Sequence, residues 1–361
     1  MRLIIDKDIP FIEGVFEPFA EVVYEKGSAI NKALVKEADA LIIRTRTKCN
    51  KELLEGSAVK MIASATIGKD HVDLGYCAAH GIRFINAAGC NAGGVMQYVF
   101  TALYAVAVKK GLKLPVSGEK KMVLGIIGVG NVGTKVAELG EYLGFEVLRN
   151  DPAKEREQTL AFNNGYLQLT DFKDYYSLEY LLEHSDIITV HVYLDEKTQG
   201  MVNMPFLQQA KSGVIFINSS RGEVVDEQAL LLAKDKLSAL ILDVWDQEPD
   251  INRKLLVAAD IATPHIAGYS YEGKLNGTQM VVRGVADFFG IEKLKNFTIT
   301  PDTPNINHLT LKNLSEEKIY EKLNDIFPIF EQSKVLRESP ADFEKIRSDY
   351  KYRREFYVNY Q

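Results

Sequence analysis

The sequence has few cysteines, and their spacing excludes the usual metal-binding arrangements. Cys49, Cys77 and Cys90 are odd in number and form no closely spaced pair of the kind that ligates zinc. Such a set also provides no disulfide framework. We therefore expect free thiols in a reducing cytoplasm and no bound metal.

Neither an excess of positive charge nor a long apolar run is present. The formal net charge is -6 with 25% charged residues, a balance that argues against binding to nucleic acid or to an anionic membrane. Polar residues and glycines interrupt the longest uncharged run, 84–108, so only its second half can form a helix, which is too short to cross a bilayer. Charges at Arg2 and Asp6 interrupt any signal-peptide core. We expect a cytoplasmic protein without nucleic-acid or membrane partners.

The chain contains enough apolar residues for more than one domain. With 361 residues and 46% hydrophobic side chains, two or three domains are expected. In residues 1–93, short apolar runs alternate with amphipathic segments. The alternation predicts strands at 3–5, 40–44, 60–64 and 83–86 and helices at 31–37 and 51–54. This pattern is typical of a parallel sheet with helices on both faces.

A second α/β domain is predicted over residues 94–271. It begins with an apolar helix at about 94–109, and its strands are expected at 123–127, 146–150, 187–192, 214–218, 239–243 and near 261. A helix at about 272–290 is expected to return to the first domain and complete it.

The remaining residues, 291–361, are rich in charge and tyrosine. A strand is predicted at 297–300 and helices at 316–327 and 340–350. Because this third part is too short for a large core of its own, we expect it to dock or to mediate dimerisation.

A glycine-rich turn follows the first strand of the second domain. Gly128, Gly130 and Gly133 form the pattern G-x-G-x-x-G between that strand and a helix over 131–143. The first glycine permits a tight turn, the second lets backbone N–H groups approach a pyrophosphate, and the third allows close packing of helix on strand. The helix N-terminus adds partial positive charge. The pattern predicts a dinucleotide site, although such turns also occur for structural reasons alone.

Asp151 indicates which dinucleotide binds. It follows the second strand of this domain, about 20 residues after Gly128, where a carboxylate accepts hydrogen bonds from the adenosine ribose. A carboxylate there also repels a 2′-phosphate, which favours NAD over NADP. Arg149, two residues earlier, could weaken that preference.

Three further segments follow predicted strands and carry side chains suited to oxidising a hydroxy acid. His265 is the natural base, since an imidazole titrates near neutral pH. Glu248 can orient the ring and favour its charged form, and Arg221 can bind a carboxylate in a bidentate manner. Each residue taken alone is more often an ordinary loop or surface residue. Their order on a dinucleotide-binding domain favours the catalytic interpretation.

The order of these motifs resembles that of the D-isomer-specific 2-hydroxyacid dehydrogenase family. The matching runs are G-V-G-N-V-G, S-R-G-E-V-V-D, D-V-W-D-Q-E-P and T-P-H-I-A-G, and the resemblance covers roughly residues 40–290. It implies an α/β fold with a Rossmann domain that binds NAD and a flavodoxin-like substrate domain. It also implies Arg221, Glu248 and His265 as the catalytic residues, with His265 as acid/base. The positions that would contact the dinucleotide are Gly128, Gly130, Asn131, Val132, Gly133, Asp151, Val192, Ser219, Ser220, Arg221, Asp243 and Gly268.

Other runs resemble a narrower group within this family. They are I-R-T-R-T at 43–47, A-T-I-G-K-D-H-V-D at 65–73, A-G-C-N at 88–91, G-Y-S-Y-E-G-K at 268–274 and the tail at 339–350 and 352–356. This resemblance implies oxidation of 4-phospho-D-erythronate at C2 to the 2-oxo acid, a step in pyridoxal 5′-phosphate synthesis. It also implies a homodimer formed by an extra, small α+β C-terminal domain.

The narrower resemblance also implies residues that bind the phosphorylated hydroxy acid. The matching hydroxyl positions, which could bind a polyol, are Thr45, Thr66 and Tyr269. The candidates for its phosphate, each of which could equally be a solvated loop residue, are Arg44, Arg46, Lys48 and Lys69. A further hypothesis is a contribution from the partner subunit by Arg353 or Arg354.

Two positions depart from these patterns. Thr45 stands where the narrower group usually has serine, which keeps the hydroxyl. Val192 and Tyr193 stand where the family usually has a small polar residue and a proline, in a loop expected along the nicotinamide side of the cofactor. Two alternatives stay open: a related dehydrogenase of 3-phosphoglycerate or glyoxylate type, and an NADH-sensing binding protein of the same fold.

Overall fold

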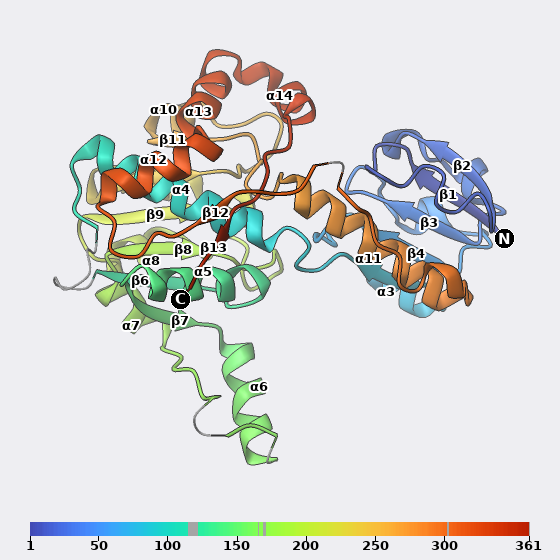
Figure 1. Ribbon diagram of the computed structural model, residues 1–361, viewed down its shortest axis with the longest axis horizontal. Coiled ribbons are helices and arrows are strands. Elements are labelled where there is room, and N and C mark those ends of the chain that lie inside the picture. Colours follow the sequence, from blue (N-terminus) through green and yellow to red (C-terminus); the bar gives the residue numbers. More distant parts are fainter. Residues whose placement is uncertain (115–121, 165, 169–170, 302, 361) are drawn as a thin grey trace. The chain divides into compact units, whose positions relative to one another are not determined.

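The computed structural model describes residues 1–361 except 115–121, 165, 169–170, 302 and 361. The chain forms two compact units (Figure 1). Unit 1 comprises Met1–Asn91 and Ser270–Pro304, and unit 2 comprises Ala92–Tyr269 and Asn305–Gln361. The segment that was expected to form a third domain, 291–361, is therefore divided between the two units.

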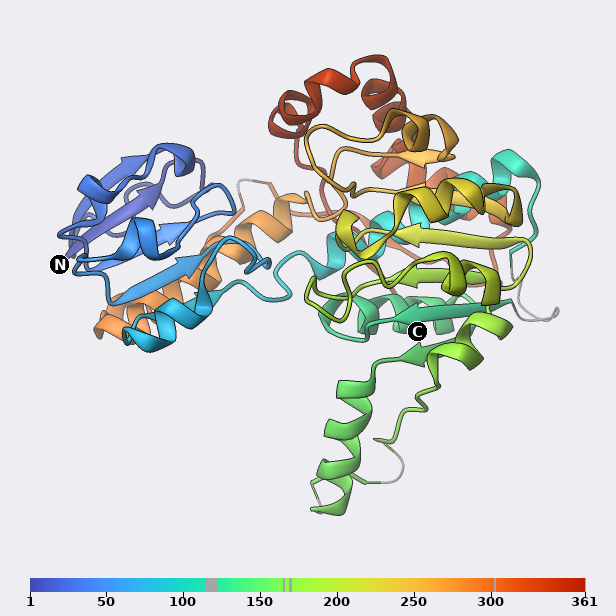
Figure 2. The same cartoon turned by 180° about the vertical axis from the view of Figure 1, so that it is seen from behind.

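Unit 1 is built on a five-stranded parallel sheet of order β2-β1-β3-β4-β5 (Figure 2). The strands are β1 (Arg2–Asp6), β2 (Glu21–Glu25), β3 (Ala40–Ile43), β4 (Met61–Ser64) and β5 (Arg83–Asn86). This is the flavodoxin-like strand order. The sequence did not predict β2, because no residue of that strand is fully buried and its ends are glutamates.

Successive strand residues point to opposite faces of this sheet, and each face has its own core. On one face Leu3, Ile5 and Ile42 pack with helix α11 (Tyr271–Phe289). On the other face lie the helices α1 (Lys32–Val35), α2 (Lys51–Leu54) and α3 (Leu74–Ala79). Gly277 and Gly284 let α11 lie close to the sheet, since a Cβ at Gly277 would stand 2.9 Å from the Ala65 carbonyl oxygen and one at Gly284 would overlap Ile85. The helix expected to complete the first domain therefore belongs to unit 1.

Unit 2 is built on a six-stranded parallel sheet of order β11-β10-β9-β8-β6-β7. The strands are β6 (Val123–Ile127), β7 (Glu146–Asn150), β8 (Ile187–Val190), β9 (Val214–Asn218), β10 (Leu237–Leu242) and β11 (Ile261–Ala262). The strand order reverses between β6 and β8. In open α/β sheets, ligands bind at such a switch point, outside the carboxyl ends of the strands.

Helices cover both faces of the second sheet. One core contains α4 (Ala92–Lys110), which is almost entirely buried, and α5 (Asn131–Tyr142). The opposite core contains α7 (Leu178–His184), α8 (Met204–Gln209), α9 (Glu227–Leu232) and α10 (Arg253–Ala258). Helix α6 (Pro152–Asn163), which the sequence did not predict, has no buried residue and extends away from the sheet (Figures 1 and 2).

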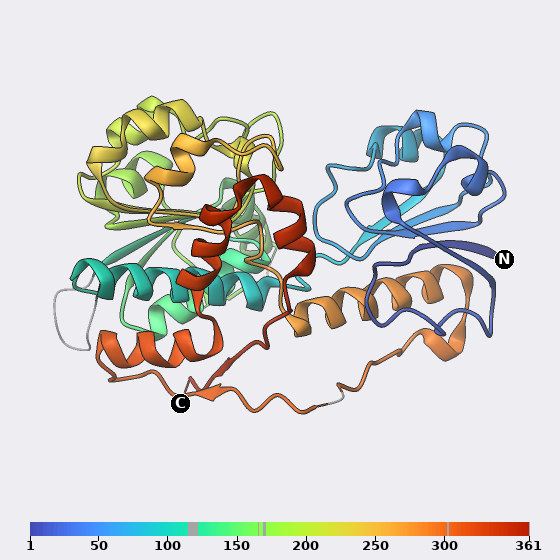
Figure 3. The same cartoon turned by 90° about the horizontal axis from the view of Figure 1, so that it is seen from above.

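The C-terminal segment, residues 305–361, packs in both cores of unit 2 (Figure 3). It contains α12 (Glu316–Ile326), α13 (Ile329–Glu338), α14 (Phe343–Asp349) and a two-residue parallel pairing of β12 (His308–Leu309) with β13 (Tyr357–Val358). Leu323 and Phe327 pack in the same core as α4, and Leu336 and Phe343 pack in the opposite one. The segment therefore has the expected mixture of helix and strand but no separate core.

The strand predicted at 297–300 is not formed. The Phe297 carbonyl accepts a hydrogen bond from Arg283 Nε at 2.7 Å, and the Ile299 N–H donates to Gln279 Oε1 at 2.7 Å. The backbone of this extended segment is thus hydrogen-bonded to side chains of α11 and to no neighbouring strand.

Among the described residues, no helix is long and apolar enough to cross a membrane. Within the same residues, no group of His, Cys, Asp and Glu could hold a metal ion. The three cysteines are free and buried.

Candidate active site

The glycine turn lies at the switch point of the second sheet. Gly128 has φ +86°, and a Cβ there would stand 2.6 Å from the His191 carbonyl oxygen. A Cβ at Gly133 would overlap the Gly128 carbonyl, so α5 can approach the turn only without a side chain. A Cβ at Gly130 would meet nothing within 4 Å, which leaves open space at the N-terminus of α5. The turn therefore presents unobstructed backbone at a helix start, as a pyrophosphate requires.

Asp151 connects this turn to the end of the neighbouring strand. Its Oδ2 accepts the Val129 N–H at 2.9 Å, and its Oδ1 accepts the Ala153 and Lys154 N–H groups and so caps α6. Arg149 forms an ion pair with Glu141 instead. The guanidinium that could have weakened the preference for NAD is therefore paired with another carboxylate.

The loop after β8 lies against the glycine turn. Its His191 N–H donates to the Ile127 carbonyl at 2.7 Å, and Val192 lies next to Gly128. Burial lowers the pKa of His191 to about 3, so this imidazole is neutral and unsuited to acid/base work near neutral pH. Tyr193 is 52% exposed. Val192, which departs from the family pattern, thus lies against the glycine turn, and Tyr193, which also departs from it, is about half exposed.

The loop that carries Arg221 is organised by Asn218 at the end of β9. Asn218 Oδ1 accepts from the Ser220 N–H and hydroxyl at 3.0 and 2.8 Å, and its Nδ2 donates to the Arg221 carbonyl at 2.9 Å. Arg221 Nη1 donates to the Ser220 carbonyl at 2.7 Å. Ser219 Oγ is buried and has no hydrogen-bond partner among the described residues. The sequence analysis missed Asn218, although its place at a strand end beside the predicted serines was a usable signal.

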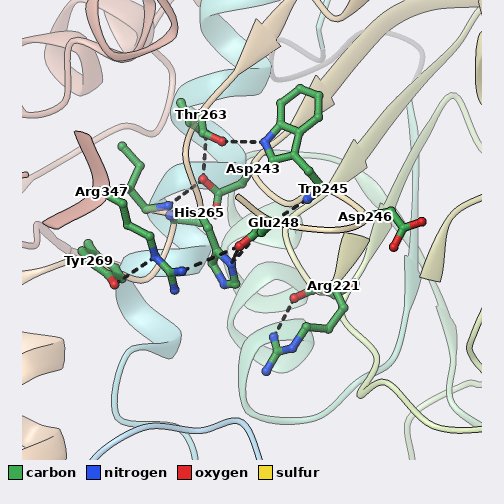
Figure 4. Close-up of polar contacts among 12 residues, drawn as sticks. Arg221, Asp243, Trp245, Asp246, Glu248, Thr263, His265, Tyr269 and Arg347 are labelled. Carbon is green, nitrogen blue, oxygen red and sulfur yellow. Dashed lines mark hydrogen bonds and ion pairs between the residues drawn. The ribbon is translucent and has the colours of Figure 1, made fainter. Parts of the chain in front are cut away.

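Gly222 brings this loop against the segment that contains Glu248. A Cβ at Gly222 would overlap the backbone of Trp245 and Asp246. Trp245 is 1% exposed and donates its Nε1–H to the Thr263 carbonyl at 3.0 Å. The close approach therefore joins the three segments that carry the predicted catalytic residues (Figure 4).

Glu248 and His265 form a hydrogen-bonded pair (Figure 4). His265 Nδ1 lies 2.8 Å from Glu248 Oε2 and 3.1 Å from Oε1. Because an ionised carboxylate can only accept, Nδ1 carries the proton and Nε2 of the neutral ring holds the lone pair. The Glu248 and His265 side chains are 17% and 27% exposed. Both side chains are therefore largely shielded from solvent but remain accessible to a small molecule.

The environment keeps Glu248 ionised. Burial raises the pKa of its carboxyl, but the charge and hydrogen bond of His265, the charge of Arg347 and the Trp245 N–H outweigh burial and lower it overall. His265 has φ +57°, a conformation uncommon for a residue with a side chain. Its N–H donates to the Asp243 carbonyl at 2.7 Å, which holds the backbone in this conformation.

Asp243 is hydrogen-bonded to the loop that carries His265. It is 1% exposed, and its oxygens accept hydrogen bonds from Thr263 Oγ1 at 2.6 Å and from the Ile266 and Ala267 N–H groups at 2.8 Å each. Burial raises the pKa of this carboxyl. The Asp243 carboxylate thus holds the Thr263 hydroxyl before His265 and the backbone after it, and its predicted contact with the dinucleotide remains a prediction.

Two arginines of the C-terminal segment reach the same loop. Arg353 donates to the backbone carbonyls of Gly94, Ile266, Ala267 and Tyr269 at 2.5 to 3.2 Å. It is 7% exposed. The Arg353 guanidinium is therefore used inside its own chain, and the hypothesis that Arg353 or Arg354 reaches a partner's site stays a prediction. Arg347 contacts Glu248 and Tyr269, which the sequence analysis did not foresee.

The predicted substrate residues other than Tyr269 belong to unit 1. Arg44 donates through Nη1 to the Asp8 carbonyl at 2.5 Å and lies 3.8 Å from Asp6. Thr66 shares a hydrogen bond with Ser64 at 2.8 Å. The remaining positions are exposed loop residues, namely Thr45, Arg46, Lys48 and Lys69.

Comparison with known proteins identifies the family. Residues 104–267 match the family model "D-isomer specific 2-hydroxyacid dehydrogenase, NAD binding domain". The erythronate-4-phosphate dehydrogenases of Bacteroides fragilis and Bacteroides thetaiotaomicron are each 42% identical, over 98% of this chain and 97% of their own. The structure of D-lactate dehydrogenase from Aquifex aeolicus with NAD and lactic acid is 28% identical, with a TM-score of 0.63 over 84% of this chain and 100% of that one.

The chain belongs to the D-isomer-specific 2-hydroxyacid dehydrogenase family. The family predicted from the four motifs is thereby confirmed, and residues 104–267 match its NAD-binding domain. Three features of the structure fit NAD: the open space over Gly130, the buried and unpartnered Ser219 Oγ, and the Asp151 carboxylate beside the turn.

Proposed function

We propose that the chain oxidises 4-phospho-D-erythronate at C2 to (R)-3-hydroxy-2-oxo-4-phosphooxybutanoate, a step in pyridoxal 5′-phosphate synthesis. The observation that carries the proposal is the Glu248–His265 pair, held at 2.8 Å in the loops that follow β10 and β11, on the same parallel sheet whose β6 leads into the glycine turn. Similarity to erythronate-4-phosphate dehydrogenases over 98% of the chain supports the choice of substrate.

In this proposal the residues of unit 2 perform the acid/base chemistry. His265 Nε2 accepts the proton of the C2 hydroxyl, because Nδ1 already donates to Glu248. The Glu248 carboxylate stabilises the imidazolium that results. Arg221 binds the substrate carboxylate and stabilises negative charge on the C2 oxygen. The nicotinamide of NAD, when bound, would supply the acceptor for the hydride that leaves C2.

Different residues of unit 2 would hold the different parts of NAD. The turn at Gly128–Gly133, including Asn131 and Val132, would bind the pyrophosphate, and Asp151 the adenosine ribose. Contacts nearer the nicotinamide would come from Val192, Ser219, Ser220, Asp243 and Gly268.

Residues of unit 1 are the candidates for binding the substrate phosphate and hydroxyls. Thr45 and Thr66 supply hydroxyl groups. Arg46 is exposed and Arg44 partly exposed, so either can offer a guanidinium to a phosphate.

We also propose a cytoplasmic homodimer in which the C-terminal segment contributes to the interface. This segment exposes apolar side chains, including Ile306 at 81% and Tyr357 at 45%. Exposed apolar groups favour association. Sedimentation equilibrium measures the mass directly, and a monomer at micromolar concentration would contradict the proposal.

A substrate comparison tests the proposed reaction. NADH formation is followed with 4-phospho-D-erythronate, 3-phosphoglycerate and D-lactate, at enzyme concentrations high enough to see one turnover. We expect by far the highest kcat/KM for 4-phospho-D-erythronate. A preference for another hydroxy acid would identify that acid as the substrate. NADH binding without any turnover would support an NADH-sensing binding protein.

A further inference from the structure

Arg347 in helix α14 lies against the Glu248–His265 pair (Figure 4). Its Nη1 is 3.7 Å from Glu248 Oε2, the same oxygen that lies 2.8 Å from His265 Nδ1. Its Nε donates to the Tyr269 hydroxyl at 3.1 Å. The Arg347 side chain is only 16% exposed. A guanidinium from the C-terminal segment is thus in direct contact with the charged partner of the candidate base.

Arg337 and Arg353 of the same segment make a different kind of contact. Arg337 donates to the carbonyls of Leu256 and Ala259 at 2.5 and 2.6 Å, and Arg353 donates to backbone carbonyls alone. Such bonds fix the path of the chain. Arg347 instead reaches two side chains of the site, so its charge acts on groups that titrate or bind ligands.

The sign of its effect follows from the charges that face the pair. Glu248 faces His265 and Arg347, and His265 faces Glu248 and the buried Asp243. Arg347 itself faces Tyr269, Glu248 and Glu344. With Arg347 present, part of the Glu248 charge is balanced before the imidazole takes up a proton. The guanidinium therefore opposes protonation of the pair, in a site where burial reduces solvent screening.

We propose that Arg347 is a positioning residue that holds the Glu248 carboxylate toward His265 and, through its fixed positive charge, keeps the pair ready to accept a proton at neutral pH. The C-terminal segment then contributes to catalysis through electrostatics, in addition to its packing. The proposal rests on the proposed function in one respect, that His265 serves as the base.

The test compares Arg347→Gln and Arg347→Lys with the matched control Arg337→Gln. The His265 ring signal is assigned by its loss in His265→Gln, and its titration is followed by NMR in the full-length protein. The acidic limb of kcat/KM for hydroxy-acid oxidation is measured in parallel. Arg337→Gln removes a partly buried guanidinium of the same segment that contacts the Leu256 and Ala259 carbonyls and not the site, so it reports the effect of lost packing.

We expect Arg347→Gln to move both the titration midpoint and the acidic limb to higher pH by about one unit. Arg347→Lys keeps the charge and should restore most of the wild-type profile. Arg337→Gln should lower the thermal stability and leave both pH values in place. The proposal would be overturned if the titration midpoint and the acidic limb of kcat/KM were unchanged in Arg347→Gln. It would also be overturned if Arg337→Gln shifted both to the same extent.

The NMR arm separates this proposal from the proposed function. A moved titration midpoint in a protein that oxidises no hydroxy acid would uphold the electrostatic role of Arg347 and reject the reaction. Normal turnover with an unchanged titration midpoint would support the proposed reaction and reject the electrostatic role of Arg347.

Discussion

Three groups from different parts of the chain converge on the Glu248 carboxylate: the Trp245 N–H, the His265 ring and the Arg347 guanidinium. Each favours the ionised form, and together they outweigh the burial that would otherwise raise the pKa of this carboxyl. The residue types of the site were predictable from the sequence, because Arg221, Glu248 and His265 each follow a strand. Arg347 was not predictable, because no local pattern links a C-terminal helix to a loop far away in the chain.

The lowered pKa of Glu248 gives an acid-dependent contribution to stability. A carboxyl whose pKa is lower in the folded state stabilises the fold above its unfolded pKa, and this contribution is lost as the pH falls through the folded value. Wild type should therefore lose an increment of stability below about pH 4.5 that Glu248→Gln lacks. Thermal unfolding at neutral and acid pH measures the difference, and parallel pH dependences of the two proteins would contradict it.

Asp151 should determine the choice of cofactor. Asp151→Ser keeps an oxygen that can cap α6 but removes the charge that repels a 2′-phosphate. We expect the ratio of kcat/KM for NAD over NADP to fall by about tenfold or more, for a loss of about 1.4 kcal/mol of discrimination. Asp151→Asn is the control that keeps the shape of the side chain. An unchanged ratio in both variants would place the ribose contact elsewhere.

At the scale of elements, the strands of the two sheets were predicted well, because parallel strands buried on both faces form short, continuous apolar runs. The predicted strands 83–86, 123–127, 146–150 and 214–218 agree with β5, β6, β7 and β9. The elements that the sequence did not predict include β2 and α6, in which no residue is fully buried, and the helices α7, α8, α10 and α13. The wrong strand at 297–300 shows the limit of local pattern: its backbone partners are helix side chains, which only the fold supplies.

Substitutions at Gly133 and Gly130 distinguish the effect of helix packing on stability from the effect of lost space for the cofactor. A Cβ at Gly133 would overlap the Gly128 carbonyl, whereas one at Gly130 would meet nothing within 4 Å. Gly133→Ala should therefore lower the melting temperature and weaken NADH binding. Gly130→Ala should leave the melting temperature unchanged but weaken NADH binding about tenfold or more, because the methyl group occupies the space expected for the pyrophosphate. NADH fluorescence and thermal unfolding measure both, and full NADH affinity in Gly130→Ala would contradict the assignment.

At the scale of the whole molecule, the chain forms two units although the sequence indicated three parts. The C-terminal segment was expected to be too short for its own core, and it indeed completes the cores of unit 2. Its charged and tyrosine-rich composition could not show this, because the buried positions of α12 and α13 become apparent only when the helices pack beside α4.

Phe327 measures how much unit 2 depends on this segment. Its ring is 2% exposed, packs in the core with α4 and lies 4.2 Å from the Arg353 guanidinium. Phe327→Ala should lower the free energy of unfolding by about 3 to 5 kcal/mol. Phe162→Ala, in the exposed helix α6, should cost much less. Equal losses in the two variants would mean that the segment is only attached to the surface of unit 2.

The measurement that tests the central claim most directly is the transfer of hydrogen from C2. With 4-phospho-D-erythronate deuterated at C2 and NAD, we predict one deuterium in the reduced cofactor, a slower single turnover than with unlabelled substrate, and a rate about a hundredfold or more lower in His265→Ala with unchanged NADH affinity. Reduced cofactor without deuterium would show oxidation at another carbon. A wild-type rate in His265→Ala would remove His265 as the base.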